Sequence, residues 1–498
     1  MAFAIFTQIL LFWLCAAQIL RGGLCVGEQD GVASVMALKH RGFGGIKYKN
    51  SFELLKISNN RSSIRLNALR SRRPHHHHHG RRHHSLDMSL PLRASSDYIM
   101  SLMLGTPPQR LEVFMDTGSD LVWVPCSSNS SKKGFFDCIM CEGLDIPTFS
   151  EFDSHSNRPE SCGTVSCSAI HSNDNLNDLC IMAGCPFDTL DMEPCQNPCP
   201  PFYYAYGDGS LMGELRRDSL TVHQSKGGTR EISNFTFGCA RISLGEAVGV
   251  AGFGRGILPF PAQLSEMGSR GFSYCLVSHK FDDNLHVSSP LLFGDIAIPK
   301  QGKVQYTPMI NNSIYPSFYY LGLEGISIGD HWLKLPSSLT QFDSEGNGGL
   351  IIDSGTTFTM LPESLHRKII NRLKTAIQYN RSVDFEEATG LDLCYNFPTA
   401  KGAPMLPTFK FHFKDNATIT LPAENYMFMI PDSDDHTTST TNITSTSVGC
   451  LIILSSGDEV YGPAAVLGNY QQQNLNVVYD MEKQRIGFLP KICSANAH

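Results

Sequence analysis

The chain has 498 residues, more than one hydrophobic core usually serves, so we expect two packed lobes and an accessory segment. Hydrophobic residues make up 42% and charged residues 17%, which excludes a chain disordered throughout. Residues 1–96 hold 14 Lys and Arg against 4 Asp and Glu, a balance of +10; subtracting these from the totals of 40 and 47 leaves −17 for the rest. The chain is therefore a basic leader attached to an acidic body.

The first residues have the pattern of a secretory signal. An apolar run between Ile5 and Ile19 is too short to span a bilayer comfortably, and it predicts a signal peptide over residues 1–25. The tail from Lys491 is polar, so we expect neither a membrane anchor nor a lipid anchor. The expected destination is the extracellular space or cell wall, or the vacuole through the secretory pathway.

Residues 26–96 form a basic, histidine-rich segment that we interpret as a propeptide or linker. It shows little periodic hydrophobicity and carries five consecutive histidines, His75–His79, between Arg-Arg pairs. The preferred interpretation is an exposed native linker, with an expression tag and a metal site as the weaker alternatives.

From residue 97 the texture is that of an all-β protein, with short runs of Val, Ile, Phe and Tyr between turn residues. We assign residues 97–297 to an N-terminal lobe and 298–498 to a C-terminal lobe. Two polar interruptions, 126–199 and 431–449, should lie on the surface. The elements expected most clearly are strands at Tyr98–Leu104, Leu111–Met115, Leu121–Val124, Phe318–Ile328 and Leu475–Tyr479, and one amphipathic helix at Pro362–Tyr379.

Cysteine usage fits export. Of 16 cysteines, Cys15 and Cys25 lie in or beside the signal, which leaves 14 in the body, an even number suited to seven disulfides. The spacing of Cys138 and Cys141 also imitates a zinc site, but export and the even count favour disulfides, and we expect no metal and no cofactor. Six sequons downstream of the signal and the basic segment are candidate glycosylation sites: Asn129, Asn234, Asn311, Asn380, Asn416 and Asn442.

One short loop occurs twice. Phe114–Ser119 (FMDTGS) recurs 237 residues later as Ile351–Thr356 (IIDSGT), each an apolar strand that delivers an Asp into a hydroxyl-Gly-hydroxyl turn. A single such turn would be an ordinary Asx-type turn. Two copies at lobe-sized spacing instead predict that Asp116 and Asp353 meet across a pseudo-dyad, supported by turn N–H groups and by the hydroxyls of Thr117 and Ser354.

Two carboxylates in contact cannot both ionise easily, so the pair should keep one proton over a wide acidic range. The ionised carboxylate would take a proton from a water held between the two, and that water would attack a peptide carbonyl. The protonated partner would stabilise the oxygen charge before a proton reaches the leaving amine. This pattern predicts an acid-active endopeptidase.

These motifs resemble those of the pepsin-like aspartic proteases, and more closely the plant nepenthesin-like branch, from Asp97 to Cys493. The matching pieces are LGTPPQ from Leu104, DTGSDLVWVPC from Asp116, YGDGS from Tyr206, GFGRG from Gly252, IIDSGTTFTMLP from Ile351 and VLGNYQQQNLNVVYD from Val466. The resemblance implies a bilobal pepsin-like fold, two pseudo-dyad-related β lobes with the cleft between them. A carboxylate pair sharing one proton is the known chemistry of this class.

The resemblance also implies roles for single residues. Tyr206 corresponds to a flap tyrosine and Trp123 to its hydrogen-bond partner; a hairpin aromatic and a core residue are the plainer interpretations. Ser119 and Thr356 correspond to hydroxyls bonded to the two Asp residues, and Gly118 and Gly355 to turn glycines near the substrate backbone. The disulfide pairing it implies is Cys126 with Cys138, Cys141 with Cys239, Cys162 with Cys199, Cys167 with Cys195, Cys275 with Cys493 and Cys394 with Cys450, which leaves Cys180 with Cys185.

The leader takes the place of a zymogen propeptide. We expect it to be an intramolecular inhibitor that covers the acidic body by long-range attraction, which weakens as Asp and Glu protonate. A merely solvated basic tail is the alternative. The expected partners are polypeptide substrates bound extended in the cleft of a monomer.

Two rival functions fit the sequence less well. A catalytically silent inhibitor or receptor on the same fold is disfavoured because both Asp loops and Tyr206 are present. A nucleic-acid-binding protease is disfavoured because a body at −17 repels phosphate.

Overall fold

The computed structural model describes residues 51–70, 88–95, 97–127 and most of 136–495. Its gaps within the last range are 140, 142–145, 173, 187–194, 207–208, 225–226, 246–247, 266–270, 280–286, 301, 399–403, 431–445 and 459–460. The predicted signal peptide, the histidine run, and residues 431–445 of the predicted polar loop lie outside the described residues.

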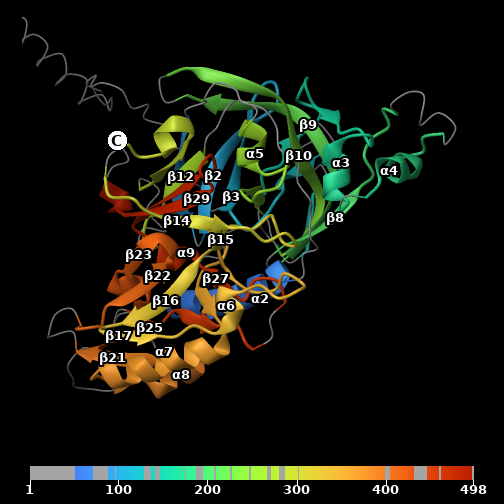
Figure 1. The fold of residues 1–498 in the computed structure, drawn as a ribbon. Coiled ribbons are helices and arrows are strands. Elements are labelled where there is room, and N and C mark those ends of the chain that lie inside the picture. Colours follow the sequence, from blue (N-terminus) through green and yellow to red (C-terminus); the bar gives the residue numbers. More distant parts are fainter. Residues whose placement is uncertain are drawn as a thin grey trace, which may run out of the picture.

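The described chain folds into two β-rich lobes (Figure 1), which confirms the predicted fold class. The strands of the N-terminal lobe are β2 (Asp97–Leu104), β3 (Gln109–Asp116), β4 (Val122–Ser127), β5 (Asp137–Ile139), β6 (Phe149–Ser150), β7 (Arg158–Pro159), β8 (Phe202–Tyr206), β9 (Gly209–His223), β10 (Thr229–Leu244) and β11 (Gly249–Gly252). Its short helices are α3 (Val165–Ile170), α4 (Leu176–Met182) and α5 (Phe260–Ser265).

The C-terminal lobe repeats this texture. Its strands are β15 (Tyr320–Leu321), β16 (Leu323–Ile328), β17 (His331–Leu333), β18 (Leu350–Ile352), β19 (Thr359–Leu361), β20 (Asn380–Arg381), β21 (Cys394–Pro398), β22 (Phe409–Phe413), β23 (Thr418–Leu421), β24 (Met427–Ile430), β25 (Thr446–Leu451), β26 (Ile453–Ser455) and β27 (Ala465–Leu467). Its α-helices are α6 (Ser337–Thr340), α7 (Glu363–Ala376), α8 (Val383–Thr389) and α9 (Asn469–Gln472).

A sheet between the lobes joins them. Its strands run in the order β1 (Met88–Ser95), β13 (Ser289–Phe293), β12 (Gly271–Cys275), β28 (Leu475–Asp480), β29 (Arg485–Pro490) and β14 (Gln305–Ile310), all antiparallel. Strand β1 also pairs with β2, so the sheet structure begins at Met88, upstream of the lobe boundary expected at residue 97.

The same three-strand unit positions each Asp loop. In the N-terminal lobe, β11 lies parallel to β3 and antiparallel to β4, and Gly252 is paired with Asp116. In the C-terminal lobe, β27 lies parallel to β18 and antiparallel to β19, and Leu467 is paired with Ile352. The repeated sequence motif therefore corresponds to a repeated structural unit.

The expected amphipathic helix is present as α7, and the expected strands are present as β2, β3, β4, β15 with β16, and β28. Leu365, Ile369, Ile370 and Leu373 of α7 are buried at the helical spacing seen in the sequence.

The leader contains a helix that the sequence did not predict. Helix α2 (Ser51–Arg70) lies against the C-terminal lobe, close to strand β8, which ends at Tyr206 (Figure 1). Its buried residues are spaced three or four apart, and its apolar members, Leu55, Leu66 and Leu69, join a core cluster of the C-terminal lobe. At least this part of the leader is therefore not an exposed linker.

Five of the disulfide pairings implied by the resemblance are wrong: Cys126–Cys138, Cys141–Cys239, Cys162–Cys199, Cys167–Cys195 and Cys180–Cys185. The structure instead joins Cys126 to Cys239, Cys138 to Cys141, Cys162 to Cys180, Cys167 to Cys199 and Cys185 to Cys195. The pairs Cys275–Cys493 and Cys394–Cys450 are confirmed.

Strand pairing explains the main correction. Because β10 runs parallel to β4, Cys126 and Cys239 come within 5.3 Å at Cα. Cys138 and Cys141 lie in one tight turn, 5.4 Å apart at Cα. The rest of the cysteine-rich insert is not wholly superficial, because Cys162, Cys167 and Cys180 form a small core with Trp123.

We predict that disulfide mapping of the folded protein will find Cys126 joined to Cys239 and Cys138 joined to Cys141. The measurement is mass spectrometry of non-reduced proteolytic peptides with alkylation of any free thiol. A peptide joining Cys126 to Cys138 would contradict the β4–β10 pairing; the Cys394–Cys450 peptide, common to both schemes, is the internal control.

Candidate active site

Hydrogen bonds between their hydroxyl residues join the two Asp loops. The backbone N–H of Thr117 donates to Ser354 Oγ at 3.1 Å, and the N–H of Ser354 donates to Thr117 Oγ1 at 2.9 Å. Each hydroxyl also reaches the opposite strand: Ser354 Oγ donates to the Met115 carbonyl and Thr117 Oγ1 to that of Ile352. This reciprocal pattern brings the two loops together, as the sequence repeat predicts.

The carboxylates are fixed by their own turns. Asp116 Oδ1 accepts the N–H of Gly118 at 2.9 Å, and Asp353 Oδ1 accepts that of Gly355 at 3.0 Å. Asp353 Oδ2 also accepts the hydroxyl of Thr356 at 2.7 Å. Both Asp residues are buried, Asp353 completely.

The two halves differ at the outer hydroxyl. Thr356 contacts its Asp as the resemblance implies, whereas the buried Ser119 Oγ has no hydrogen-bond partner in the part of the chain that the structure describes. The expected Ser119–Asp116 hydrogen bond is thus absent from this structure, in which Asp116 Oδ1 instead accepts hydrogen bonds from Arg65 and Gly118.

The turn glycines are required by close approach. A Cβ added to Gly118 would lie 2.7 Å from Asp353 Oδ1 and 2.7 Å from Arg65 Nη2, and one added to Gly355 would collide with Asp116 Oδ1. Each glycine therefore faces the carboxylate of the other loop. A side chain at either position would push the two carboxylates apart.

Arg65 of helix α2 bridges the two carboxylates. Its Nη2 lies 2.6 Å from Asp116 Oδ1 and its Nε 3.2 Å from Asp353 Oδ2. The Arg65 side chain is only 8% exposed, and the Asp side chains 6% and 0%, so the three charges lie almost out of contact with solvent. No feature of the leader sequence singled out this arginine.

The local electrostatics follow from burial and charge. Burial lowers the pKa of Arg65, but Asp116 and Asp353 outweigh it, so the pKa lies above its usual value and the guanidinium stays charged. Burial raises the pKa of Asp353, Arg65 lowers it, and Asp116 raises it, with a net increase over the ordinary value. The site is thus a carboxylate pair with one cation placed between its members.

Buried polar residues behind the loops were not predicted. Gln472 of α9 donates from Nε2 to the carbonyls of Asp353 at 3.1 Å and Leu467 at 2.9 Å. Its Oε1 accepts the hydroxyl of Tyr274 at 2.5 Å, and that hydroxyl lies 3.0 Å from the hydroxyl of Tyr479. The only sequence signal was the polar run QQQN inside an otherwise apolar segment.

Other expected site residues are placed less completely. Tyr206 ends strand β8 opposite Gly209, in the hairpin expected to be the flap, and its side chain lies outside the described parts. Trp123 is buried in β4 and packs in the insert core. Its predicted hydrogen bond to Tyr206 stays a prediction.

Four of the six sequons lie among the described residues, and the asparagines of all four, Asn234, Asn311, Asn380 and Asn416, are exposed. Asn129 and Asn442 fall outside. The groups of cysteine and histidine that could hold a metal among the described residues, Cys162–Cys185–Cys195 and Cys167–His171–Cys199, have all their cysteines in disulfides. Of the helices described, none has the length and apolar character needed to cross a membrane.

Comparison with known proteins places this geometry in a family. The family models described as xylanase inhibitor N-terminal and xylanase inhibitor C-terminal match residues 98–295 and 318–490. A probable aspartyl protease of Arabidopsis thaliana is 38% identical over 82% of this chain and 84% of its own. Aspartic proteinase nepenthesin-1 of Nepenthes gracilis is 32% identical over 80% of this chain and 79% of its own.

Among solved structures, conglutin gamma, a basic 7S globulin from lupine seeds, matches with a TM-score of 0.57 at 18% identity, over 83% of this chain and 95% of that chain. This likeness concerns the fold alone. Two family models over most of the body, and relatives above 30% identity, show that the chain belongs to the plant nepenthesin-like, pepsin-like aspartic protease family.

Proposed function

We propose that the protein is a secreted aspartic endopeptidase, made as a self-inhibited precursor, that hydrolyses peptide bonds at acidic pH. The observation that carries the proposal is the geometry at Asp116 and Asp353. Both carboxylates are buried, each accepts a turn N–H, and the loops that bear them are joined by reciprocal hydroxyl bonds. A non-catalytic protein of this fold would not need two such carboxylates where the two loops meet.

In the proposed mechanism, the two carboxylates hold one proton between them once Arg65 has left. The ionised member takes a proton from a water bound at the pair, and that water attacks the carbonyl of the scissile bond. The protonated member donates a hydrogen bond to the developing oxyanion, and a proton then passes to the leaving amine. Thr356, which donates to Asp353 Oδ2, helps to keep that carboxylate oriented.

Helix α2 supports the self-inhibited state. Arg65 occupies the position between the carboxylates where the water would have to sit. Several polar contacts hold the helix on the C-terminal lobe. Among them, Asn59 Nδ2 donates to the Gly390 carbonyl at 3.2 Å, the Phe358 N–H donates to Ser62 Oγ at 3.0 Å, and Arg70 donates to the Ser456 carbonyl at 3.0 Å. In this proposal the leader inhibits through one specific ion triad rather than through long-range attraction.

The direction of the pH effect follows from linkage. Arg65 lowers the pKa of Asp353, so loss of this cation on undocking increases the proton affinity of that carboxylate. Protons therefore favour undocking. The attraction between Arg65 and Asp353 is complete when Asp353 is ionised, and it is lost as the pH falls through the pKa of Asp353 in the docked state.

A second candidate is the catalytically silent relative. Two likenesses favour it. A 7S globulin has a similar fold, and the matching family models are described as xylanase inhibitor domains. It is opposed by the complete pair of Asp loops described above. The proposed destination, extracellular or vacuolar, would suit either function.

One substitution tests the role of the carboxylate pair. Asp116→Asn removes the ionisable group that activates water, and we expect acid-activated hydrolysis of a protein substrate to fall about a thousandfold or more. The measurement is cleavage between pH 3 and 7, with and without a statine-type inhibitor. Asp330→Asn, which changes an exposed carboxylate in the turn after β16, is the matched control and should retain parental activity. Absence of inhibitable activity in the parent would favour the silent relative.

Another substitution tests the inhibitory role of helix α2. Arg65→Met keeps the apolar stem but removes the cation, so the precursor should become active at a higher pH, with the midpoint raised by about one unit. The measurement is the pH dependence of activity in the full chain. Lys56→Met is the control, because Lys56 is exposed on the same helix and its replacement by Met removes the same charge. Equal shifts in both variants would mean that only the net charge of the leader matters.

A further inference from the structure

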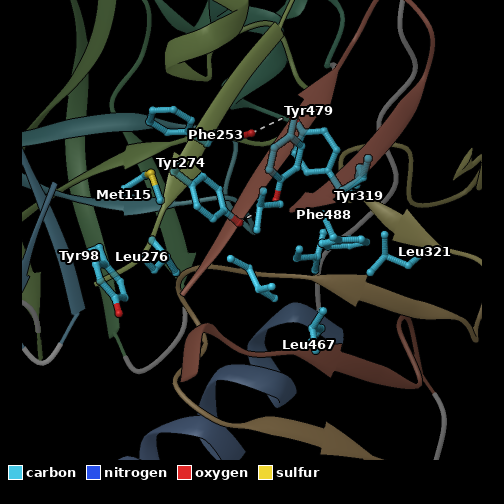
Figure 2. Packing of buried hydrophobic residues seen from close by; sticks show 14 of the residues in the cluster. Tyr98, Met115, Phe253, Tyr274, Leu276, Tyr319, Leu321, Leu467, Tyr479 and Phe488 are labelled. Carbon is cyan, nitrogen blue, oxygen red and sulfur yellow. Dashed lines mark hydrogen bonds between the residues drawn. The ribbon is translucent and has the colours of Figure 1, made fainter. Parts of the chain in front are cut away.

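Tyr319 lies where the two lobes meet, immediately before strand β15 of the C-terminal lobe. Its side chain is 1% exposed, and its ring packs edge-on against the rings of Phe272 and Tyr479. Figure 2 shows Tyr319 beside Tyr479 in this core. Burial raises the pKa of the Tyr319 phenol well above its ordinary value, so the hydroxyl keeps its proton and can donate it. The ring is therefore fixed by packing, and its hydroxyl acts as a hydrogen-bond donor.

The backbone of Tyr319 is joined to the Asp353 loop. Its carbonyl accepts the N–H of Ile352 at 3.0 Å, and Ile352 is the residue before Asp353. This hydrogen bond extends the ladder between β15 and β18, in which Tyr320 pairs with Ile351. A movement of the Tyr319 backbone is therefore passed to the strand that carries Asp353.

The hydroxyl of Tyr319 is joined to the other lobe. It donates to the carbonyl of Phe253 at 2.9 Å, and the carbonyl of Gly254 lies 3.2 Å from the same hydroxyl. Both acceptors belong to the segment that follows β11, the strand that lies parallel to β3. The Tyr319 side chain therefore crosses from one lobe to the other.

The segment that receives this hydrogen bond is itself fixed to the Asp116 loop. The N–H of Phe253 donates to the carbonyl of Asp116 at 2.7 Å, and the N–H of Gly254 donates to the carbonyl of Ser119 at 2.8 Å. Just before them, Gly252 is paired with Asp116 in the ladder between β11 and β3. This segment and the Asp116 loop therefore form one hydrogen-bonded unit.

Three hydrogen bonds in series thus connect one Asp loop with the other. The first joins the Asp116 carbonyl to the N–H of Phe253, and the second joins the Phe253 carbonyl to the Tyr319 hydroxyl. The third joins the Tyr319 carbonyl to the residue before Asp353. This series is separate from the reciprocal hydroxyl bonds that join the two loops directly.

The backbone joins the same two segments at a second point. The N–H of Arg255 donates to the carbonyl of Ser317 at 3.0 Å. One attachment alone would leave the two segments free to pivot about it, whereas two attachments fix their relative orientation. The Tyr319 hydroxyl is the attachment that a side-chain substitution can remove.

We propose that Tyr319 is a positioning residue whose hydroxyl sets the orientation of the Asp116 loop relative to the Asp353 loop. The proposal rests on the endopeptidase function proposed above. Removing the hydroxyl should leave the two loops joined but allow the two carboxylates to turn relative to each other. Small displacements of reacting groups are costly in rate, so the effect should fall on the chemical step rather than on substrate binding.

Tyr426 offers a matched control. It is a tyrosine of the C-terminal lobe with 1% exposure, and its hydroxyl donates to the backbone carbonyl of Pro407 at 2.5 Å. No hydrogen bond in the described part of the chain joins Pro407 to either Asp loop. Tyr319→Phe and Tyr426→Phe each remove a buried phenol hydroxyl that donates to a backbone carbonyl, so the two changes should cost similar stability.

The experiment compares the parent, Tyr319→Phe and Tyr426→Phe as the acid-activated full chain. Active sites are counted by titration with a statine-type inhibitor, so that unfolded protein does not count as lost catalysis. We expect kcat per site to fall about tenfold in Tyr319→Phe with KM unchanged, and both constants to stay at the parental values in Tyr426→Phe. Thermal unfolding should show similar decreases of the midpoint in the two variants, which separates a loss of orientation from a loss of stability.

The positioning role is overturned if Tyr319→Phe keeps the parental kcat per site, or if the two variants lose kcat equally. It is also overturned if Tyr319→Phe has no titratable sites while the parent does, because the hydroxyl would then be needed for folding itself. An increase in KM at unchanged kcat would place the effect in substrate binding and would overturn the role as well. Absence of inhibitable activity in the parent and in Tyr426→Phe would instead overturn the endopeptidase proposal, and the positioning role with it.

Discussion

Two carboxylates held against each other in a nearly dry seam are the constraint on which the structure depends. Burying one such charge is unfavourable, and burying two beside each other is worse unless hydrogen-bond donors or a cation compensate. The compensation here comes from turn N–H groups, from Thr356 and from Arg65. Three features hold that arrangement rigidly. They are the surrounding sheets, the strands β11 and β27 that pair with the Asp-bearing strands, and the reciprocal hydrogen bonds between Thr117 and Ser354.

The symmetry of the two lobes is real in the backbone but broken in the side chains. The three-strand units around the Asp loops match strand for strand. Yet Thr356 contacts its Asp whereas Ser119 does not, and helix α2 packs on the C-terminal lobe. A carboxylate pair that must divide one proton benefits from such differences, because they make the two members chemically unequal.

Much of this could be predicted from the sequence, and the misses have physical causes. The Asp loops, α7 and the main strands were predictable because apolar spacing and repeated turn chemistry are local signals. Helix α2 was not predictable because Ser58, Ser62 and Arg65 lie between Leu55 and Leu66 on its buried face, so no continuous apolar stripe appears. Cys126 was mispaired because its partner depends on the parallel pairing of β4 with β10, which is not a local property. Gln472 was overlooked because a buried amide has the same sequence signature as an exposed one.

The disulfides also decide what one peptide-bond cleavage can release. The 14 body cysteines all pair with one another, from Cys126 to Cys493, so none is left to bind the leader covalently. The Cys275–Cys493 bond joins residues 218 positions apart in sequence, and a nick between them would leave both pieces attached. A cut between Arg70 and Met88 has the opposite result: helix α2 becomes a separate peptide, held by its leucines, its polar contacts and Arg65 alone. Cleaving the leader and vacating the site are thus two different events, and the second is an equilibrium that a free copy of the helix could reverse.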